Sequence, residues 1–115
     1  MADPDRIDIR HESRPDGLVL TPSGDVDLLR AASLRSALMQ AIEGRPGRLV
    51  VDMHEVDYMD SSGVATLIEA MQAARESGVG FALCSLNEQV LTTLQITRLD
   101  SVFTIMDTPD DEAVA

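Results

Sequence analysis

The chain has 115 residues, a length typical of one globular domain, and its 44% hydrophobic content is enough for a packed core. Its charged residues comprise nine arginines, no lysine and 20 acids, and the formal net charge is -11. Nucleic acids and anionic membrane surfaces bind basic surfaces, so we expect neither as a partner. No apolar run approaches the ~20 residues of a membrane span, and the N-terminus lacks a signal-peptide pattern. These features predict a cytoplasmic protein.

The first half of the chain predicts a hairpin followed by a helix. Residues 7–11 alternate between apolar and polar, and residues 18–21 follow an Arg-Pro-Asp-Gly turn, which favours two antiparallel strands. Pro22 either limits the second strand or lies where the ladder needs no donor. A helix begins at about Leu28, with Asp27 capping its start and Gly44 ending it. Its apolar positions recur at helical spacing: Leu34, Ala37, Leu38, Ala41 and Ile42.

The second half alternates strands and helices. Buried strands are predicted over 48–53 and 80–85, and a last strand over 101–106. A helix over about 62–77 packs Val64, Leu67, Ile68 and Met71 inward, turns Thr66, Glu69 and Gln72 toward water, and stops at Gly78. Asn87 can cap a third helix, with Val90, Leu91 and Leu94 on its apolar face. A short or truncated helix is expected from Thr108.

The order of these elements predicts the fold class. Alternating strands and helices favour parallel pairing with right-handed crossovers, and the initial hairpin adds an antiparallel edge. We therefore expect an α/β protein with a mixed sheet packed against helices. Residues 1–115 form one domain in this interpretation, with a core over about 6–107.

The cysteine and histidine content points to neither a disulfide nor a metal site. The single Cys84 follows the apolar residues 81–83, which predicts a buried strand position in a reducing compartment. His11 and His54 are far apart in the sequence and have no paired cysteines, so they do not form a zinc motif. We expect no metal and no cofactor.

Three acids, Asp52, Asp57 and Asp60, lie between a predicted strand end and a helix start. Their oxygens could hold magnesium, but nothing in the spacing is diagnostic, and solvated carboxylates near a helix N-terminus are the simpler interpretation. The chain also lacks a G-x-S-x-G elbow, a P-loop and a dinucleotide-binding glycine pattern. A hydrolase or a nucleotide-binding enzyme therefore has little support from the residues, although the partners of a catalytic triad need not be near in sequence.

The sequence Asp-Ser-Ser-Gly at 60–63 precedes the second predicted helix. An aspartate or serine can cap that helix and stabilise it by ~1 kcal/mol. One cap residue is sufficient, however, and three small polar groups followed by glycine would leave an entrance that another protein could approach closely. The residues alone leave both interpretations open, a cap or a contacted serine.

Three stretches carry a resemblance to a known family. The sequence "VVDMHEVDYMDSSGVATLIEAM" at 50–71, with "SGDVD" upstream and "LQITRLDSVFTIM" downstream, resembles the STAS-domain anti-sigma factor antagonists. The resemblance covers nearly the whole chain, and the serine motif is its most specific part. Arg98 departs from the pattern, because members commonly carry glycine or a small residue before the leucine that follows the third helix.

The resemblance implies a phosphorylated serine and a partner. In that family the serine after the motif's aspartate is modified by an anti-sigma factor that is also a serine kinase, and a separate phosphatase removes the phosphate. That serine corresponds to Ser61. Unphosphorylated protein binds the kinase and frees a sigma factor; phosphorylation abolishes binding. The resemblance places five residues at or near the partner-binding face: Asp25, Asp27, Asp60, Ser62 and Gly63.

Two further hypotheses remain. The chain could be a non-switching STAS scaffold or accessory domain in a stress-signalling or lipid-transport complex. It could also be a nucleotide- or metabolite-binding STAS module, although the sequence offers no phosphate cradle. The intact serine motif favours the phosphorylation switch.

Overall fold

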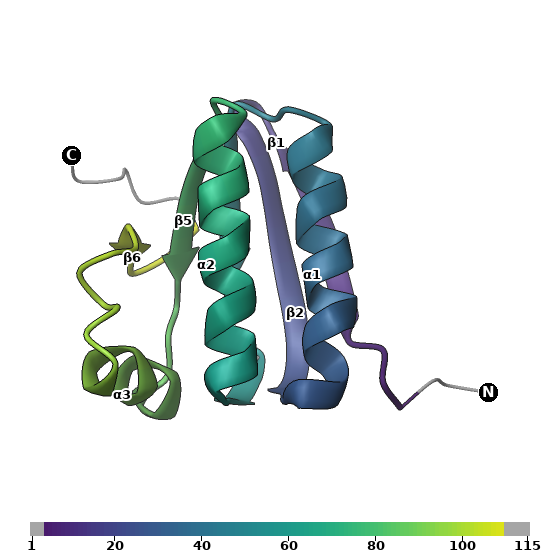
Figure 1. Ribbon diagram of the computed structural model, residues 1–115. Helices are drawn as coiled ribbons and strands as arrows, with labels where there is room; N and C mark the ends of the chain where they lie inside the picture. Colours follow the sequence, from purple (N-terminus) through teal and green to yellow (C-terminus); the bar gives the residue numbers. More distant parts are fainter. Residues whose placement is uncertain (1–3, 110–115) are drawn as a thin grey trace.

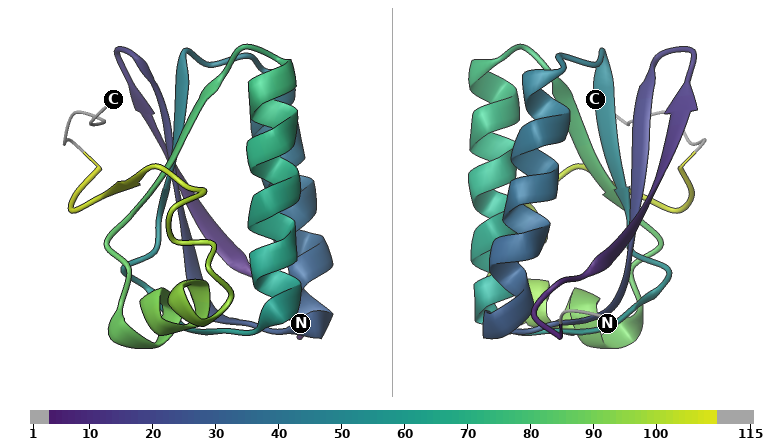
Figure 2. Two further views of the ribbon diagram at one scale, coloured as in Figure 1. Left: turned by 60° about the vertical axis from the view of Figure 1, so that its left-hand side comes forward. Right: turned by 90° about the vertical axis from the view of Figure 1, so that its right-hand side faces the viewer.

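A six-stranded sheet with two long helices packed side by side on one of its faces forms the body of the protein (Figures 1 and 2). The structure is a computed structural model and describes residues 4–109. Its elements are β1 (Asp8–Arg14), β2 (Gly17–Val26), α1 (Leu28–Glu43), β3 (Arg48–Asp52), β4 (Val56–Met59), α2 (Ser61–Glu76), β5 (Gly80–Cys84), α3 (Glu88–Ile96) and β6 (Ile105–Met106).

The sheet has the predicted mixed topology. The main strand order is β1-β2-β3-β5-β6, and β4 pairs with β2 beyond the end of β3. The hairpin β1–β2 is antiparallel, and every other pair is parallel, as alternation of strands and helices requires. Pro22 lies inside β2, between the last residue paired with β3, Leu20, and the first paired with β4, Gly24. It therefore interrupts neither parallel ladder.

The main core lies between the sheet and the pair α1–α2. Aliphatic side chains from every layer fill it, as the 3% aromatic content predicts. Most of the predicted inward residues of α1 and α2 are buried, whereas Ala37, Ala41 and Ile68 are half-buried. Thr66, predicted to face water, is buried. Because α2 packs against α1 as well as the sheet, its buried stripe is wider than a one-sided pattern indicates. Met59 and Met71 also belong to this core.

A smaller apolar cluster lies on the opposite face of the sheet. It joins β2, β3, β5 and β6 through Val19, Val50, Ala82, Cys84 and Met106. The prediction that Cys84 occupies a buried strand position is therefore confirmed.

Helix ends follow the predicted caps, with one change of detail. Asp27 and Asn87 cap α1 and α3, and Gly78 ends α2 with a left-handed φ of 72°. Gly44 is the C-cap of α1 in a right-handed conformation, and the left-handed residue there is Arg45, with φ 52°. Arg98 follows the α3 C-cap with φ 59°, a conformation that favours glycine.

Two strand predictions were wrong or incomplete. The sequence predicts no strand between residues 53 and 62, but Val56–Met59 form β4. The predicted strand over 101–106 shortens to Ile105–Met106, because the preceding backbone is used in turns: Leu99 N–H donates to Leu94 O (2.7 Å) and Val102 N–H to Leu99 O (3.0 Å). Phe103 still enters the main core. The expected C-terminal helix lies largely outside the described residues.

Candidate functional site

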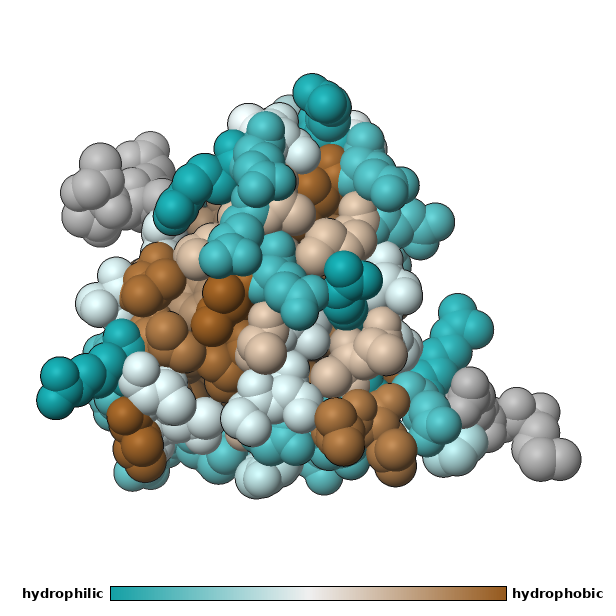
Figure 3. Space-filling view, viewed as in Figure 1, coloured by the Kyte–Doolittle hydropathy of each residue, from teal (hydrophilic) through white to brown (hydrophobic). Residues whose placement is uncertain are grey.

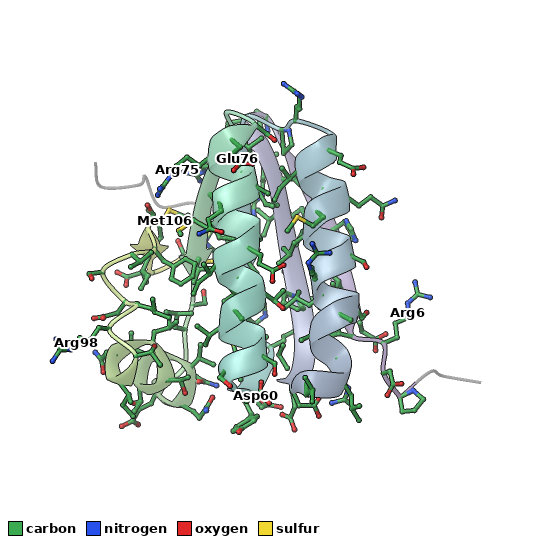
Figure 4. The ribbon with its side chains drawn as sticks, viewed as in Figure 1. Arg6, Asp60, Arg75, Glu76, Arg98 and Met106 are labelled. Carbon is green, nitrogen blue, oxygen red and sulfur yellow. The ribbon has the colours of Figure 1, made fainter. Side chains whose placement is uncertain are left out.

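The entrances of α1 and α2 lie at the same end of the molecule (Figure 1). Each helix follows one of two paired parallel strands: β2 leads through Val26 into α1, and β4 leads through Met59 into α2. Val26 and Met59 are register partners, and Asp60 N–H donates to Val26 O at 3.1 Å. Figure 4 places Asp60 at this end of α2, opposite Arg75 and Glu76. The strand register thus brings the two predicted motifs, 23–27 and 60–63, together.

Asp60 caps α2 through one oxygen of its carboxylate. Its Oδ1 accepts hydrogen bonds from the backbone N–H groups of Ser62 (2.9 Å) and Gly63 (3.3 Å). Its own carbonyl accepts from Val64 N–H at 3.1 Å. Because this carboxylate satisfies two donors that a helix start leaves unpaired, neither serine is needed as a cap.

Ser61 is the first residue of α2 and is exposed to solvent. Its hydroxyl makes no hydrogen bond with any other residue in the described part of the chain. Ser62, the next residue, is half-buried. A kinase could therefore reach the Ser61 oxygen without breaking an internal interaction. The helix N-terminus would favour an added phosphate, whereas the adjacent Asp60 carboxylate would oppose it.

Gly63 faces the core. A Cβ on this residue would lie 2.6 Å from Met59 Cγ and 2.9 Å from Val26 Cγ1, both on buried side chains. Gly63 thus lets α2 approach the ends of β2 and β4 closely, instead of leaving an open surface at the helix entrance. We therefore assign Gly63 a packing role.

The two acids of the upstream motif occupy different environments. Asp25 is exposed on β2, in register with Tyr58 of β4. Asp27 is half-buried and caps α1, where its Oδ1 accepts from Arg30 N–H at 3.1 Å. Asp25 is therefore free to meet a partner, whereas part of the Asp27 carboxylate is already used by the helix.

Gln89 of α3 and the α3 N-cap, Asn87, support the α2 entrance, a role that the sequence did not predict. The Gln89 side chain accepts from Met59 N–H (3.0 Å) and donates to Met59 O (3.2 Å). The Asn87 amide donates to Val56 O at 2.8 Å, while its oxygen caps α3 at Val90 N–H. The cap signal of Asn87 was visible in the sequence, but nothing local indicates that these side chains reach β4.

The acids between β3 and α2 do not converge on a cation. Asp52 Oδ1 accepts from the backbone N–H of His54 (3.1 Å) and lies 2.8 Å from its Nδ1. Asp57 is exposed on β4, and Asp60 caps α2. Among residues 4–109, no group of three or more histidine, cysteine or acidic side chains is arranged to hold a metal ion. Across the same residues, no helix has both the length and the apolar character needed to cross a membrane.

This mixed sheet, with two helices on one face and a capped serine motif at the α2 entrance, is a STAS domain. Residues 6–112 match the model of the STAS domain family, and the chain belongs to that family. The predicted family and fold class are thereby confirmed.

Curated relatives of the chain are named anti-sigma factor antagonists. Anti-sigma-F factor antagonist RsfB of Mycobacterium tuberculosis is 26% identical over 111 residues, 96% of this chain and 90% of that protein. An anti-sigma-B factor antagonist of Listeria monocytogenes is 28% identical over 96 residues, 82% of each chain. The crystal structure of an anti-sigma factor antagonist from Mycobacterium paratuberculosis superposes with a TM-score of 0.84 at 25% identity, covering 96% of this chain and 94% of the other.

Proposed function

We propose that this protein is an anti-sigma factor antagonist switched by phosphorylation of Ser61. The unphosphorylated form binds an anti-sigma factor that is also a serine kinase, and the sigma factor held by that partner is released. Phosphorylation of Ser61 ends the complex, and a serine phosphatase restores the binding form. The names of the curated relatives support the antagonist role.

The observation that carries the phosphorylation step is the placement of Ser61. Its hydroxyl is exposed at the first position of α2, while Asp60 supplies the cap. A residue freed from capping can be modified without loss of the helix, because a helix N-terminus accommodates an anion. Modification should therefore leave the fold unchanged and act at the interface.

Release follows from the properties of phosphate at a docked surface. The group adds about -1.5 to -2 charges and three oxygens, which need hydration that a closed interface cannot supply. Asp60 already contributes negative charge next to the site. Steric exclusion and repulsion that weaken binding by ~3 to 4 kcal/mol would lower affinity several hundredfold.

In this proposal the protein catalyses no reaction itself. The kinase brings ATP and magnesium to Ser61, and the phosphatase performs hydrolysis. The role of Asp25, Asp27, Asp60 and Ser62 is to form the surface that these enzymes contact, and the fold's task is to present that surface in a fixed geometry.

The direct test is to incubate the purified protein with ATP and each kinase-type anti-sigma factor from the source organism, and then to map any added mass by peptide mass spectrometry. We expect modification at Ser61 and none in Ser61→Ala. Modification elsewhere, or none by any kinase that binds the chain, would contradict the proposal. Stable binding without modification would instead support the non-switching scaffold.

A further inference from the structure

Two large apolar side chains stand exposed where α1 begins. Leu28 and Leu29 retain 72% and 65% of their maximal accessible surface. They precede the buried stripe of α1, which starts at Ala31 and continues through Leu34, so neither leucine is needed to hold the helix on the sheet. Figure 3 shows an apolar area at the lower end of α1 with polar side chains beside it, and a separate, larger apolar area on the other side of α2. Exposed leucines stabilise the monomer little, but they supply contact area to a binding partner.

The strand register places this pair beside the phosphorylation site. Leu28 is two residues beyond Val26, and Ser61 is two residues beyond Met59, the register partner of Val26. Paired strands lie ~4.8 Å apart and packed helices ~8 to 10 Å apart, so both positions fall within one docking footprint. Tyr58, 44% exposed, lies on β4 in register with Asp25 and adds an exposed aromatic ring on the strand that leads into α2.

Acidic residues accompany the apolar pair. Asp25 and Asp27 precede it in the chain, and Asp60 joins from the neighbouring helix entrance. The protein as a whole carries a formal charge of -11. A second copy of the chain would bring the same acids face to face across a two-fold contact, and an anionic membrane would repel them. A protein surface with an apolar hollow and a basic rim complements both the leucines and the acids.

We infer that Leu28 and Leu29 form the apolar anchor by which this protein docks on its anti-sigma factor, in a hollow bordered by arginine or lysine side chains. The inference rests on the proposed function and adds the contact that determines affinity for the correct partner. Leucines at these positions supply attraction that salt does not screen, whereas the acids supply attraction that salt does screen.

The test compares binding of four proteins to the purified kinase-type anti-sigma factor by isothermal titration calorimetry, without ATP. They are the wild type, the double variant Leu28→Gln/Leu29→Gln, Asp25→Asn, and the control Val102→Thr. Val102 is a half-exposed apolar residue that lines a hollow with Arg75, at the other end of α2 from Asp60. Circular dichroism melts check that each variant is folded, and titrations in about 50 and 500 mM salt separate the two attractions.

We expect the double leucine variant to bind about thirtyfold more weakly or worse, with a similar factor at both salt concentrations. Asp25→Asn should lose affinity mainly at low salt, and Val102→Thr should bind like the wild type. If the double variant binds with an affinity within about threefold of the wild type, the inference is overturned and the proposed function stays intact.

Two other outcomes also overturn the inference. If the wild type binds none of the kinase-type anti-sigma factors, the proposed function and the inference both fail. The oligomeric state is measured by analytical ultracentrifugation. If the wild type dimerises and the double variant is monomeric, the leucines bind a second copy of the chain instead of the anti-sigma factor.

Discussion

The entrances of α1 and α2 are built alike but expose different chemistry. Both follow paired strands, and both are capped by an aspartate with nearly the same backbone, φ -104° and ψ -176° at Asp27 against φ -97° and ψ -173° at Asp60. The next two positions are leucines in α1 and serines in α2, and the third is Arg30 or Gly63.

The comparison separates stability from function at single positions. The cap is common to both entrances, so it is a property that each helix needs locally. The first side chain after each cap, Leu28 or Ser61, is exposed and differs between the two helices, so it can contact a partner. In our proposals α1 supplies an apolar contact through Leu28 and Leu29, and α2 supplies the serine that is phosphorylated, Ser61.

The largest expected effect is on binding, from a charge at the first position of α2. Ser61→Asp should bind the anti-sigma factor at least a hundredfold more weakly than Ser61→Ala, because a carboxylate there partly reproduces the repulsion of phosphate. Calorimetric titration measures both. The melting temperature of Ser61→Asp should stay near that of Ser61→Ala, since a helix N-terminus tolerates an acid. Equal affinities would rule out the exclusion mechanism.

The third position of each helix tests packing. Gly63→Val should lower the free energy of unfolding by about 3 kcal/mol, because the new side chain meets buried Met59 and Val26. The matched change Arg30→Val, at a half-buried position, should cost about 1 kcal/mol or less. Urea denaturation gives both values. If Gly63→Val and Arg30→Val lower the free energy of unfolding by similar amounts, Gly63 is not closely packed against Met59 and Val26.

The caps themselves should differ modestly. Asp60 accepts two backbone N–H groups and Asp27 accepts one, so Asp60→Ala should destabilise by about 1 to 2 kcal/mol and Asp27→Ala by about 1 kcal/mol. The asparagine variants keep an acceptor oxygen and should lose less than half as much. If Asp27→Ala lowers the free energy of unfolding more than Asp60→Ala, the Asp27 cap is the stronger of the two and the prediction is wrong.

The smallest expected loss of stability comes from α3. This helix contacts β4, the strand that leads into α2. Gln89→Ala removes both side-chain bonds to the Met59 backbone and should cost about 1 kcal/mol. Hydrogen exchange at the Met59 amide should accelerate as its acceptor is lost. Thr92→Ala, an exposed change on the same helix, is the control. If the exchange rate of the Met59 amide is unchanged in Gln89→Ala, the Gln89 side chain does not stabilise the α2 entrance.

Local signals explain what could be predicted from sequence. Asp27, Asp60 and Asn87 cap helices through neighbours in the chain, so their roles follow from the residue type and the apolar pattern behind them. The family resemblance then directed attention to Ser61. Helix periodicity also predicted the residues of α1 and α3 that are buried most completely, such as Leu34, Leu38 and Leu94.

Long-range pairing accounts for what was missed. The strand β4 has four residues with a buried, exposed, exposed, buried pattern, which lacks the alternation typical of strands and is stabilised by pairing with β2. Thr66 is buried because a second helix lies beside it, and Gln89 reaches a backbone 30 positions away. Leu28 and Leu29 precede the buried positions of α1, and their place in the first turn is the local sign that they can be exposed.

The close packing at Gly63 constrains how the protein can be regulated. Gly63 lies close against Met59 and Val26, so α2 has little space to move toward the sheet at the residue two positions after Ser61. Under the proposed function, phosphate on Ser61 is detectable only to a protein touching that spot. Kinase and phosphatase would therefore compete for one small surface, and the ratio of their activities would set the fraction of the antagonist in each form.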